Sequence, residues 1–176
     1  MNIEHVILVD ETDAELGVME KMQAHRTGVL HRAFSAFVFN SKGELLLQQR
    51  AFSKYHSGGL WTNTCCSHPR KGESVELAAA RRLTEEMGMN CTFSSQFSFV
   101  YRAALDHDLI EHELDHVLVG YSDDIPVPNP EEVASWRYVS LETIQQELTH
   151  DDRRYTEWFK ICFDRVSSLE FTVGSR

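Results

Sequence analysis

Apolar residues fall in short stretches along this chain, as in strands, and in the stretch Leu109–Tyr121 apolar and polar positions alternate. This pattern predicts strands at His5–Val9, Ala33–Phe39, Glu44–Gln49, Phe93–Arg102, Leu109–Tyr121 and Trp136–Val139. Residues 40–43, Asn-Ser-Lys-Gly, predict a hairpin turn between the second and third strands. Residues Ser53–Gly72 are rich in glycine, serine, asparagine and cysteine and are expected to form a long loop.

Elsewhere the apolar residues recur every three or four positions, which predicts helices. The clearest case is Glu73–Met87, where Val75 and Leu83 share one face and Gly88 follows as a C-terminal cap. Two further helices are expected at Leu141–Leu148 and Arg153–Ser167. Strands interspersed with few helices predict an α/β or α+β fold with a mixed sheet. The 176 residues contain neither a repeat nor a linker, so a single domain over residues 1–176 is expected.

The composition is that of a globular protein, with 42% hydrophobic and 25% charged residues. The net charge of −10 argues against nucleic acid or any other polyanion as a partner. The charge is uneven, however, because residues 21–82 hold ten basic and three acidic residues, whereas residues 83–152 hold two basic and fifteen acidic residues. A basic segment followed by an acidic one is a first indication of function.

No apolar stretch approaches the ~20 residues that a membrane helix needs. The acidic amino terminus lacks the features of a secretory or mitochondrial signal. Two of the four cysteines, Cys65 and Cys66, are adjacent, and no Cys-x-x-Cys pair occurs. We therefore expect a cytoplasmic protein with reduced cysteines and no membrane partner.

Acidic residues recur at alternate positions of the predicted strand 109–121. Glu111, Glu113 and Asp115 therefore share one face, which Val117 and Val119 continue. A solvated strand end explains this pattern as well as a pair of carboxylates that point into one pocket as metal ligands or acid/base groups.

Three histidines, His25, His31 and His68, precede this strand in the sequence. Each histidine alone is more often a surface or core residue than a ligand. Together with Glu111 and Glu113 they make a donor set of imidazole and carboxylate groups, which suits zinc or manganese. The sequence alone does not bring these segments together.

Cys66 lies on the predicted loop, two residues before His68. Nearby histidine and arginine residues can lower the pKa of a cysteine and make it useful in acid/base or nucleophilic chemistry. The commoner alternative is a buried structural thiol. Cys65 has the same neighbours, and this argument does not separate the two cysteines.

The predicted helix 73–87 ends with Arg81, Arg82, Glu85 and Glu86. Pairs four residues apart are ordinary surface support for a helix. The functional alternative is a carboxylate helix that holds magnesium, with arginine beside it for phosphate oxygens. Further positive charge comes from Lys21, Arg50 and Lys54.

The stretch Ser67–Met89 resembles the Nudix box, whose pattern is G-x5-E-x7-R-E-U-x-E-E-x-G-U with U a bulky apolar residue. The matching positions are Glu73, Arg81, Leu83, Glu85, Glu86, Gly88 and Met89. Two positions depart from the box: Ser67 replaces its glycine, and Arg82 replaces the glutamate after the arginine. The second departure removes a carboxylate that ordinary Nudix hydrolases use for magnesium.

This degenerate box is preceded by Trp-Thr-Asn-Thr-Cys-Cys-Ser-His-Pro at residues 61–69 and followed by Glu111-His-Glu113. The set resembles the type I isopentenyl-diphosphate isomerases over most of the chain, from Glu4 to Phe163. The resemblance implies a Nudix-like mixed sheet flanked by helices. It also implies metal-dependent interconversion of isopentenyl and dimethylallyl diphosphate by a 1,3-allylic proton shift.

The resemblance further implies roles for the matching residues. Cys66 and Glu113 match the catalytic pair, and Tyr101 matches a tyrosine beside the glutamate. A divalent Mn²⁺ or Zn²⁺ site matches His25, His31, His68, Glu111 and Glu113. Glu86 and the backbone carbonyl of Cys66 match a Mg²⁺ site bound with the substrate diphosphate. Lys21, Arg50, Lys54 and Arg82 match the basic residues around the diphosphate, and Trp158 an aromatic over the hydrocarbon.

Two other functions compete with this one. The matching box residues suggest a Nudix hydrolase of a nucleoside diphosphate derivative. The surplus of histidine and acidic residues also fits a non-catalytic metal-binding module. The sequence leaves open the native metal, the order in which Cys66 and Glu113 act, and whether the protein is a monomer or a homodimer.

Overall fold

A computed structural model describes residues 3–170 of the chain, so the ends of the predicted domain, residues 1–2 and 171–176, lie outside the described residues. The strands are β1 His5–Val9, β2 Glu15–Glu20, β3 His31–Phe39, β4 Leu45–Arg50, β5 Trp61–Thr62, β6 Cys65–Ser67, β7 Phe93–Ala104, β8 Ile110–Tyr121 and β9 Val133–Val139. The helices are α1 Lys21–Thr27, α2 Val75–Met87, α3 Leu141–Asp151 and α4 Glu157–Ser167. Short 3-10 turns lie at Asp106–Asp108 and Asp152–Arg154.

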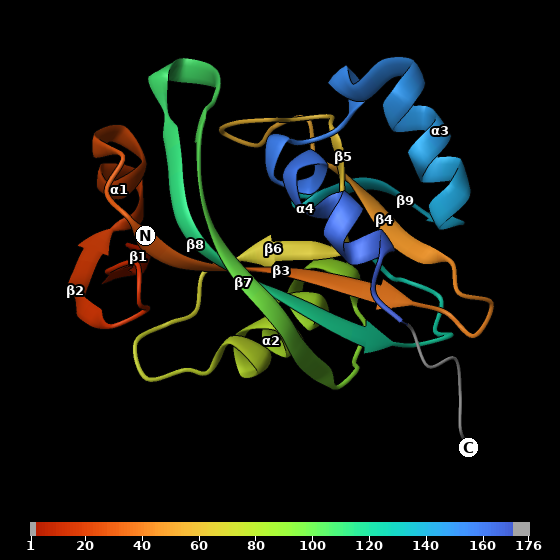
Figure 1. The fold of residues 1–176 in the computed structure, drawn as a ribbon, viewed down its shortest axis with the longest axis horizontal. Coiled ribbons are helices and arrows are strands. Elements are labelled where there is room, and N and C mark those ends of the chain that lie inside the picture. Colours follow the sequence, from red (N-terminus) through yellow and green to blue (C-terminus); the bar gives the residue numbers. More distant parts are fainter. Residues whose placement is uncertain (1–2, 171–176) are drawn as a thin grey trace.

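Strand β3 is the centre of the mixed sheet (Figure 1). It runs parallel to β8 along its whole length, with His31 opposite Glu113, and antiparallel to the short strand β6. Strand β7 pairs with the outer side of β8, and β4 carries β5 and β9. This topology places the starts of β3 and β8 side by side, next to β6.

The two faces of β3 contact different helices (Figure 1). Phe34, Ala36 and Val38 point toward α2, where they pack with Leu83 and Met87. Phe37 and Phe39 point the other way, into a core with residues of α3 and α4. Side chains that alternate along β3 therefore enter two different cores, one on each face of the sheet.

The predicted mixed sheet flanked by helices is confirmed, but several boundaries differ. The predicted loop Ser53–Gly72 contains two short strands, β5 and β6, because backbone pairing with β4 and β3 overrides the local composition. The predicted helix Arg153–Ser167 begins four residues later, at Glu157, since a 3-10 turn and the buried Tyr155 precede it. Helix α2 likewise begins at Val75, where the hydroxyl of Ser74 caps the main-chain N–H of Leu77.

The amino-terminal segment contains two elements that the apolar pattern does not predict, β2 and α1. Helix α1 has only seven residues, too few for a visible period. It is defined by its ends: the carboxylate of Glu20 accepts hydrogen bonds from the N–H groups of Met22 and Gln23, and Gly28 closes it with a positive φ of 65°.

Ser67, where the Nudix box has glycine, is the last residue of β6 and does not have a positive φ. The serine is therefore tolerated without backbone strain. Within residues 3–170, no helix is both long and apolar enough to cross a membrane.

Candidate active site

The fold gathers residues from both halves of the chain around one cavity. Twelve of the residues singled out in the sequence line it, namely Lys21, His25, Arg50, Lys54, Cys66, His68, Arg82, Glu86, Tyr101, Glu111, Glu113 and Trp158. His31 is fully buried and belongs to the same neighbourhood through its ring contacts with His25 and His68. Segments far apart in the sequence therefore meet at the edge where β3, β6 and β8 lie side by side.

The two adjacent cysteines face opposite sides of the sheet. On β6, Cys66 pairs with Ser35 and Cys65 pairs with Ala36 of β3. Cys65 is consequently buried in the core beneath α2, whereas Cys66 lines the cavity. Burial, which outweighs the nearby Arg50 charge, raises the pKa of the Cys66 thiol. The lowered pKa that the sequence offered as one alternative for Cys66 is not what this environment favours, because burial favours the protonated thiol.

Tyr101 holds the two glutamates of β8. Its hydroxyl lies 2.9 Å from Oε2 of Glu111 and 2.7 Å from Oε2 of Glu113. Both carboxylates are within reach of its single O–H donor. The register explains the contact, since Tyr101 of β7 is directly opposite Glu113. The other carboxylate oxygens lie near histidines. Oε1 of Glu111 is 3.7 Å from Nε2 of His56, and Oε1 of Glu113 is 3.0 Å from Nε2 of His68.

Glu111 and Glu113 are both buried, so their charges are costly without a counter-charge. Burial, followed by the charge of Glu113, raises the pKa of Glu111 well above its usual value. Burial also acts on Glu113, but the neighbouring imidazoles of His31 and His68 outweigh it and hold the pKa of that carboxyl well below its usual value.

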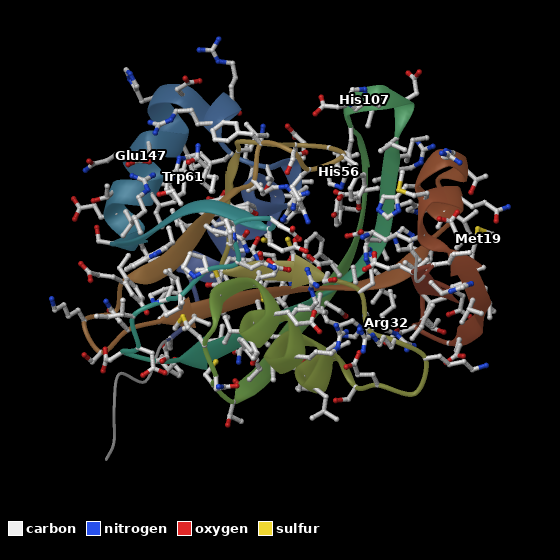
Figure 2. All side chains as sticks on the ribbon, turned by 180° about the vertical axis from the view of Figure 1, so that it is seen from behind. Met19, Arg32, His56, Trp61, His107 and Glu147 are labelled. Carbon is white, nitrogen blue, oxygen red and sulfur yellow. The ribbon has the colours of Figure 1, made fainter. Side chains whose placement is uncertain are left out.

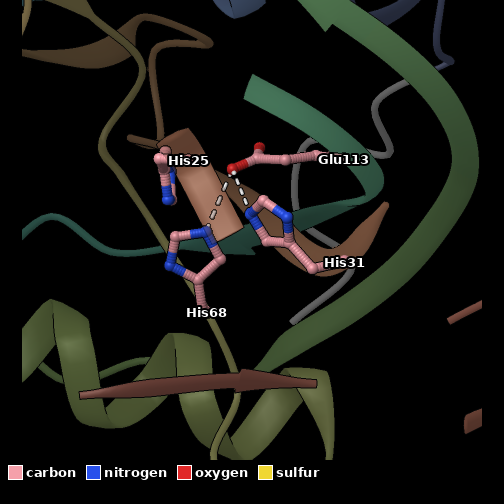
Figure 3. Close-up of side chains that lie close together, drawn as sticks. All are labelled: His25, His31, His68 and Glu113. Atoms are coloured by element: carbon pink, nitrogen blue, oxygen red, sulfur yellow. Dashed lines mark hydrogen bonds and ion pairs between the residues drawn. The ribbon is translucent and has the colours of Figure 1, made fainter. Parts of the chain in front are cut away.

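The imidazoles of His25, His31 and His68 surround the Glu113 carboxylate (Figure 3). Their backbone contacts determine which ring nitrogen carries hydrogen. Nδ1 of His25 lies 2.8 Å from the carbonyl of Lys21, and Nδ1 of His31 lies 2.8 Å from the carbonyl of Val29. A carbonyl only accepts, so Nδ1 is the donor and Nε2 keeps its lone pair in the neutral ring.

These lone pairs have no hydrogen-bond partner among residues 3–170. This holds for Nε2 of His25 and Nε2 of His31, which are both buried, and Nε2 of His31 lies 3.4 Å from Oε1 of Glu113. A lone pair facing a carboxylate oxygen is unfavourable unless a cation lies between them. Orphaned nitrogens and buried carboxylates together fit a divalent metal ion.

The structure groups four of the five expected ligands, His25, His31, His68 and Glu113, with ligand atoms within 4.8 Å of one another. The fifth, Glu111, falls in a second group with His25 and His56. A buried cluster that can bind a metal is thus present, with one histidine that the sequence did not single out.

Three basic side chains of the cavity are paired with carboxylates of the protein itself. Lys21 Nζ lies 2.7 Å from Oε2 of Glu4, Lys54 forms an ion pair with Glu132, and Arg82 Nη2 lies 2.6 Å from Oε1 of Glu86. Arg50 is different, because it is buried and its Nε has no hydrogen-bond partner. The buried guanidinium is suited to an anionic ligand.

Trp158 of α4 forms part of the cavity wall. Its indole N–H donates to Oδ1 of Asn63 at 3.2 Å, which fixes the orientation of the ring. The Arg50 guanidinium lies 5.3 Å from the ring centroid. An aromatic side chain beside charged and polar side chains can accommodate a molecule with one hydrocarbon end and one charged end.

Six cavity residues were missed in the sequence: Phe34, Ser35, Gln48, Tyr55, His56 and Glu132. Gln48 Nε2 donates to Oε2 of Glu86 at 2.9 Å, and Glu132 also lies 3.4 Å from Arg82. His56 lies inside the molecule, whereas His107 marks the outer end of the β7–β8 hairpin (Figure 2). No sequence pattern distinguishes these two histidines, and only tertiary structure does so.

Comparison with known proteins agrees with this geometry. Residues 29–159 match the NUDIX domain family. The chain is 52% identical to an isopentenyl-diphosphate Delta-isomerase of Pectobacterium atrosepticum over 94% of this chain and 93% of the relative. It is 55% identical to isopentenyl-diphosphate Delta-isomerase 1 of Aromatoleum aromaticum over 93% of this chain and 92% of the relative.

Solved structures of lower identity share the fold. A crystal structure of a Deinococcus radiodurans protein superimposes with a TM-score of 0.75 at 20% identity, covering 92% of this chain and 98% of that one. The MutT protein from Methanosarcina mazei gives a TM-score of 0.63 at 21% identity, covering 80% of this chain and 96% of that one. The fold and the relatives of the present chain lead to one assignment: this chain belongs to the isopentenyl-diphosphate Delta-isomerase family of NUDIX-domain proteins.

Proposed function

We propose that this protein interconverts isopentenyl diphosphate and dimethylallyl diphosphate by a 1,3-allylic proton shift. One observation carries the proposal: a thiol, Cys66, and a carboxylate, Glu113, line the same cavity beside the buried Arg50. The reaction needs one group that gives a proton and another that removes one, and this pair provides both.

An unactivated alkene is a weak base, and its protonation generates a species with tertiary carbocation character. Loss of a proton from the carbon on the other side then moves the double bond. Cys66 and Glu113 are the proposed acid and base of this shift. Tyr101, which donates to Glu113, holds that carboxylate in a fixed position within the cavity.

His25, His31, His68, Glu111 and Glu113 would hold a divalent Mn²⁺ or Zn²⁺ ion. When bound, the ion supplies positive charge that compensates the buried carboxylates and orients Glu113. Neutral histidines suit this role, since burial lowers the pKa of His25 and lowers that of His68 to about 4.

The diphosphate would be bound by Lys21, Arg50, Lys54 and Arg82. Glu86 and the backbone carbonyl of Cys66 would hold the accompanying Mg²⁺. Three of the four basic residues form ion pairs with Glu4, Glu86 or Glu132 in the ligand-free protein. Exchange of these partners for phosphate oxygens keeps the cations paired, and the diphosphate end thereby positions the hydrocarbon end.

Trp158 is proposed to contact the hydrocarbon. The negative face of an indole ring stabilises nearby positive charge by roughly 0.5–2 kcal/mol. An apolar wall also keeps water away from the carbocation-like species, which water would otherwise trap.

The alternative, hydrolysis of a nucleoside diphosphate derivative, requires several carboxylates on α2 for magnesium. Here Glu73 accepts two hydrogen bonds from Arg81, and Glu85 lies 2.8 Å from Arg82. Only Glu86 of the box carboxylates lines the cavity. This distribution favours isomerisation over hydrolysis.

The proposal is tested by incubating the purified, metal-loaded protein with isopentenyl diphosphate. An acid-labile allylic diphosphate is the expected product. Release of inorganic phosphate or a nucleotide from a substrate panel would favour the hydrolase, and bound metal without turnover of any substrate would favour a metal-binding module.

A further inference from the structure

His56 is a buried histidine of the cavity to which neither the sequence patterns nor the family resemblance assigned a role. It is only 4% exposed and is supplied by the loop between β4 and β5. Its Nε2 lies 3.7 Å from Oε1 of Glu111, beyond hydrogen-bonding distance. Its other ring nitrogen, Nδ1, lies 3.2 Å from the hydroxyl of Ser57, which can accept a hydrogen bond from it.

The surrounding loop is fixed around this imidazole. The guanidinium of Arg50 donates to the main-chain carbonyl of His56 at 3.2 Å. Ser57 adopts a positive φ of 52°, and its N–H donates to Oδ2 of Asp106 at 3.1 Å. A non-glycine residue in this conformation is costly, so the loop conformation is maintained by its contacts.

Two groups of metal-binding atoms share one residue. His25, His31, His68 and Glu113 form the first, and His25, His56 and Glu111 form the second. The Nδ1 of His25 is occupied by the carbonyl of Lys21, so only Nε2 is available to a metal. One nitrogen lone pair binds one ion, so two separate ions cannot both use His25, and a single centre formed from both groups is the arrangement that uses all of these donors.

The spacing of the donor atoms is consistent with that centre. Bonds of about 2.1 Å place neighbouring ligand atoms of an octahedron about 3.0 Å apart and opposite ones about 4.2 Å apart. Three donor pairs fall in this range: 3.0 Å for His68–Glu113, 3.4 Å for His31–Glu113 and 3.7 Å for His56–Glu111. The six residues do not all lie within 4.8 Å of one another, so binding of one ion would draw the two groups together.

We propose that His56 is a sixth protein ligand of the same ion, so that four imidazoles and two carboxylates close its coordination sphere. This inference rests on the proposed metal centre and deepens it. A closed sphere leaves no position for water or substrate, which is typical of ions that hold ligands in place. The ion then acts through the orientation of Glu113 rather than by contact with substrate.

The test compares Mn²⁺ binding by the full-length wild-type protein and by His56→Gln, with His150→Gln as control because His150 is exposed on α3. We expect the dissociation constant to rise about tenfold or more in His56→Gln. Water-proton relaxation of the Mn²⁺-loaded protein should also increase, since water enters the open position. The control should match wild type in both measurements.

Unchanged affinity and relaxation in a folded His56→Gln protein would overturn the proposal, and a change confined to KM would make His56 a substrate contact instead.

If the variant does not fold, NMR of the Co²⁺-loaded wild-type protein with isotope-labelled histidine provides the test. Four imidazoles with hyperfine-shifted resonances would support the proposal, and three would contradict it. Wild-type protein that binds no Mn²⁺ would overturn the metal centre itself. Unchanged Mn²⁺ binding in His56→Gln alone would remove only His56 from the centre and leave the isomerase proposal intact.

Discussion

A single position along β6 separates two cysteines with different surroundings. Cys65 is fully buried beneath α2, and Cys66 lines the cavity with Glu113 and Trp158. Nothing in the residues around the pair distinguishes them. The pairing of β6 with β3 decides between them, because it turns alternate side chains to opposite faces of the sheet.

Cys66→Ala should abolish turnover of isopentenyl diphosphate, because it removes the proposed proton donor or acceptor. Cys65→Ala is the matched control. It should retain activity and lower the free energy of unfolding by about 1 kcal/mol through the small cavity that it leaves. Steady-state kinetics and urea unfolding measure the two effects. Activity retained in Cys66→Ala and lost in Cys65→Ala would reverse the assignment.

Glu113→Gln should abolish turnover and weaken Mn²⁺ binding about 10- to 100-fold, since the amide keeps the shape but loses the charge. Glu15→Gln, at an exposed position of β2, should change neither. Product analysis and Mn²⁺ titration measure the two effects. Full activity in Glu113→Gln would remove this residue from both proposed roles.

At the level of elements, α2 carries two adjacent arginines with separate partners. Arg81 makes hydrogen bonds of 2.8 and 2.9 Å to Glu73, outside the cavity that holds Cys66. Arg82 binds Glu86 and lines that cavity. The helix therefore has one ion pair that supports its own start and another that faces the proposed diphosphate site.

Arg82→Gln should raise KM for isopentenyl diphosphate by about tenfold or more, as expected for loss of a charged hydrogen bond. Arg81→Gln should leave KM unchanged and reduce the thermal stability, since the contact with Glu73 is lost. Kinetics and thermal unfolding of both variants make the comparison. An equal rise of KM in both would show that Arg82 has no specific role in binding.

The elements with a clear period could be predicted from the sequence, and those that depend on partners could not. Strand β8 and helix α2 were predicted to within two residues because each buries one continuous face. Strand β6 and helix α1 have three and seven residues, and both are stabilised by pairing or by end caps. His25 lies on α1, so its geometry could not be predicted from periodicity.

The same limit applied to the site. The alternating acids Glu111 and Glu113 were visible as a strand face, and the buried contact with Tyr101 supports the pocket interpretation over a solvated strand end. His56 and Glu132 lie in loops without any period. Their positions depend on which loops the sheet brings together, which only the folded structure specifies.

For the molecule as a whole, the net charge of −10 first argued against an anionic partner. The fold resolves this by gathering groups of both kinds around one cavity. Buried carboxylates and histidines line it together with Lys21, Arg50, Lys54 and Arg82. A metal ion and a diphosphate therefore each meet a complementary surface inside an acidic protein.

The most direct measurement follows isopentenyl diphosphate by NMR in D₂O, with the metal-loaded protein and with the same protein after chelation. The protons of a thiol and of a carboxyl exchange with solvent, so the account predicts dimethylallyl diphosphate that carries deuterium in its new methyl group. Chelation should stop the conversion, and added Mn²⁺ with Mg²⁺ should restore it. Release of phosphate, or an unchanged substrate with the metal-loaded protein, would contradict the account.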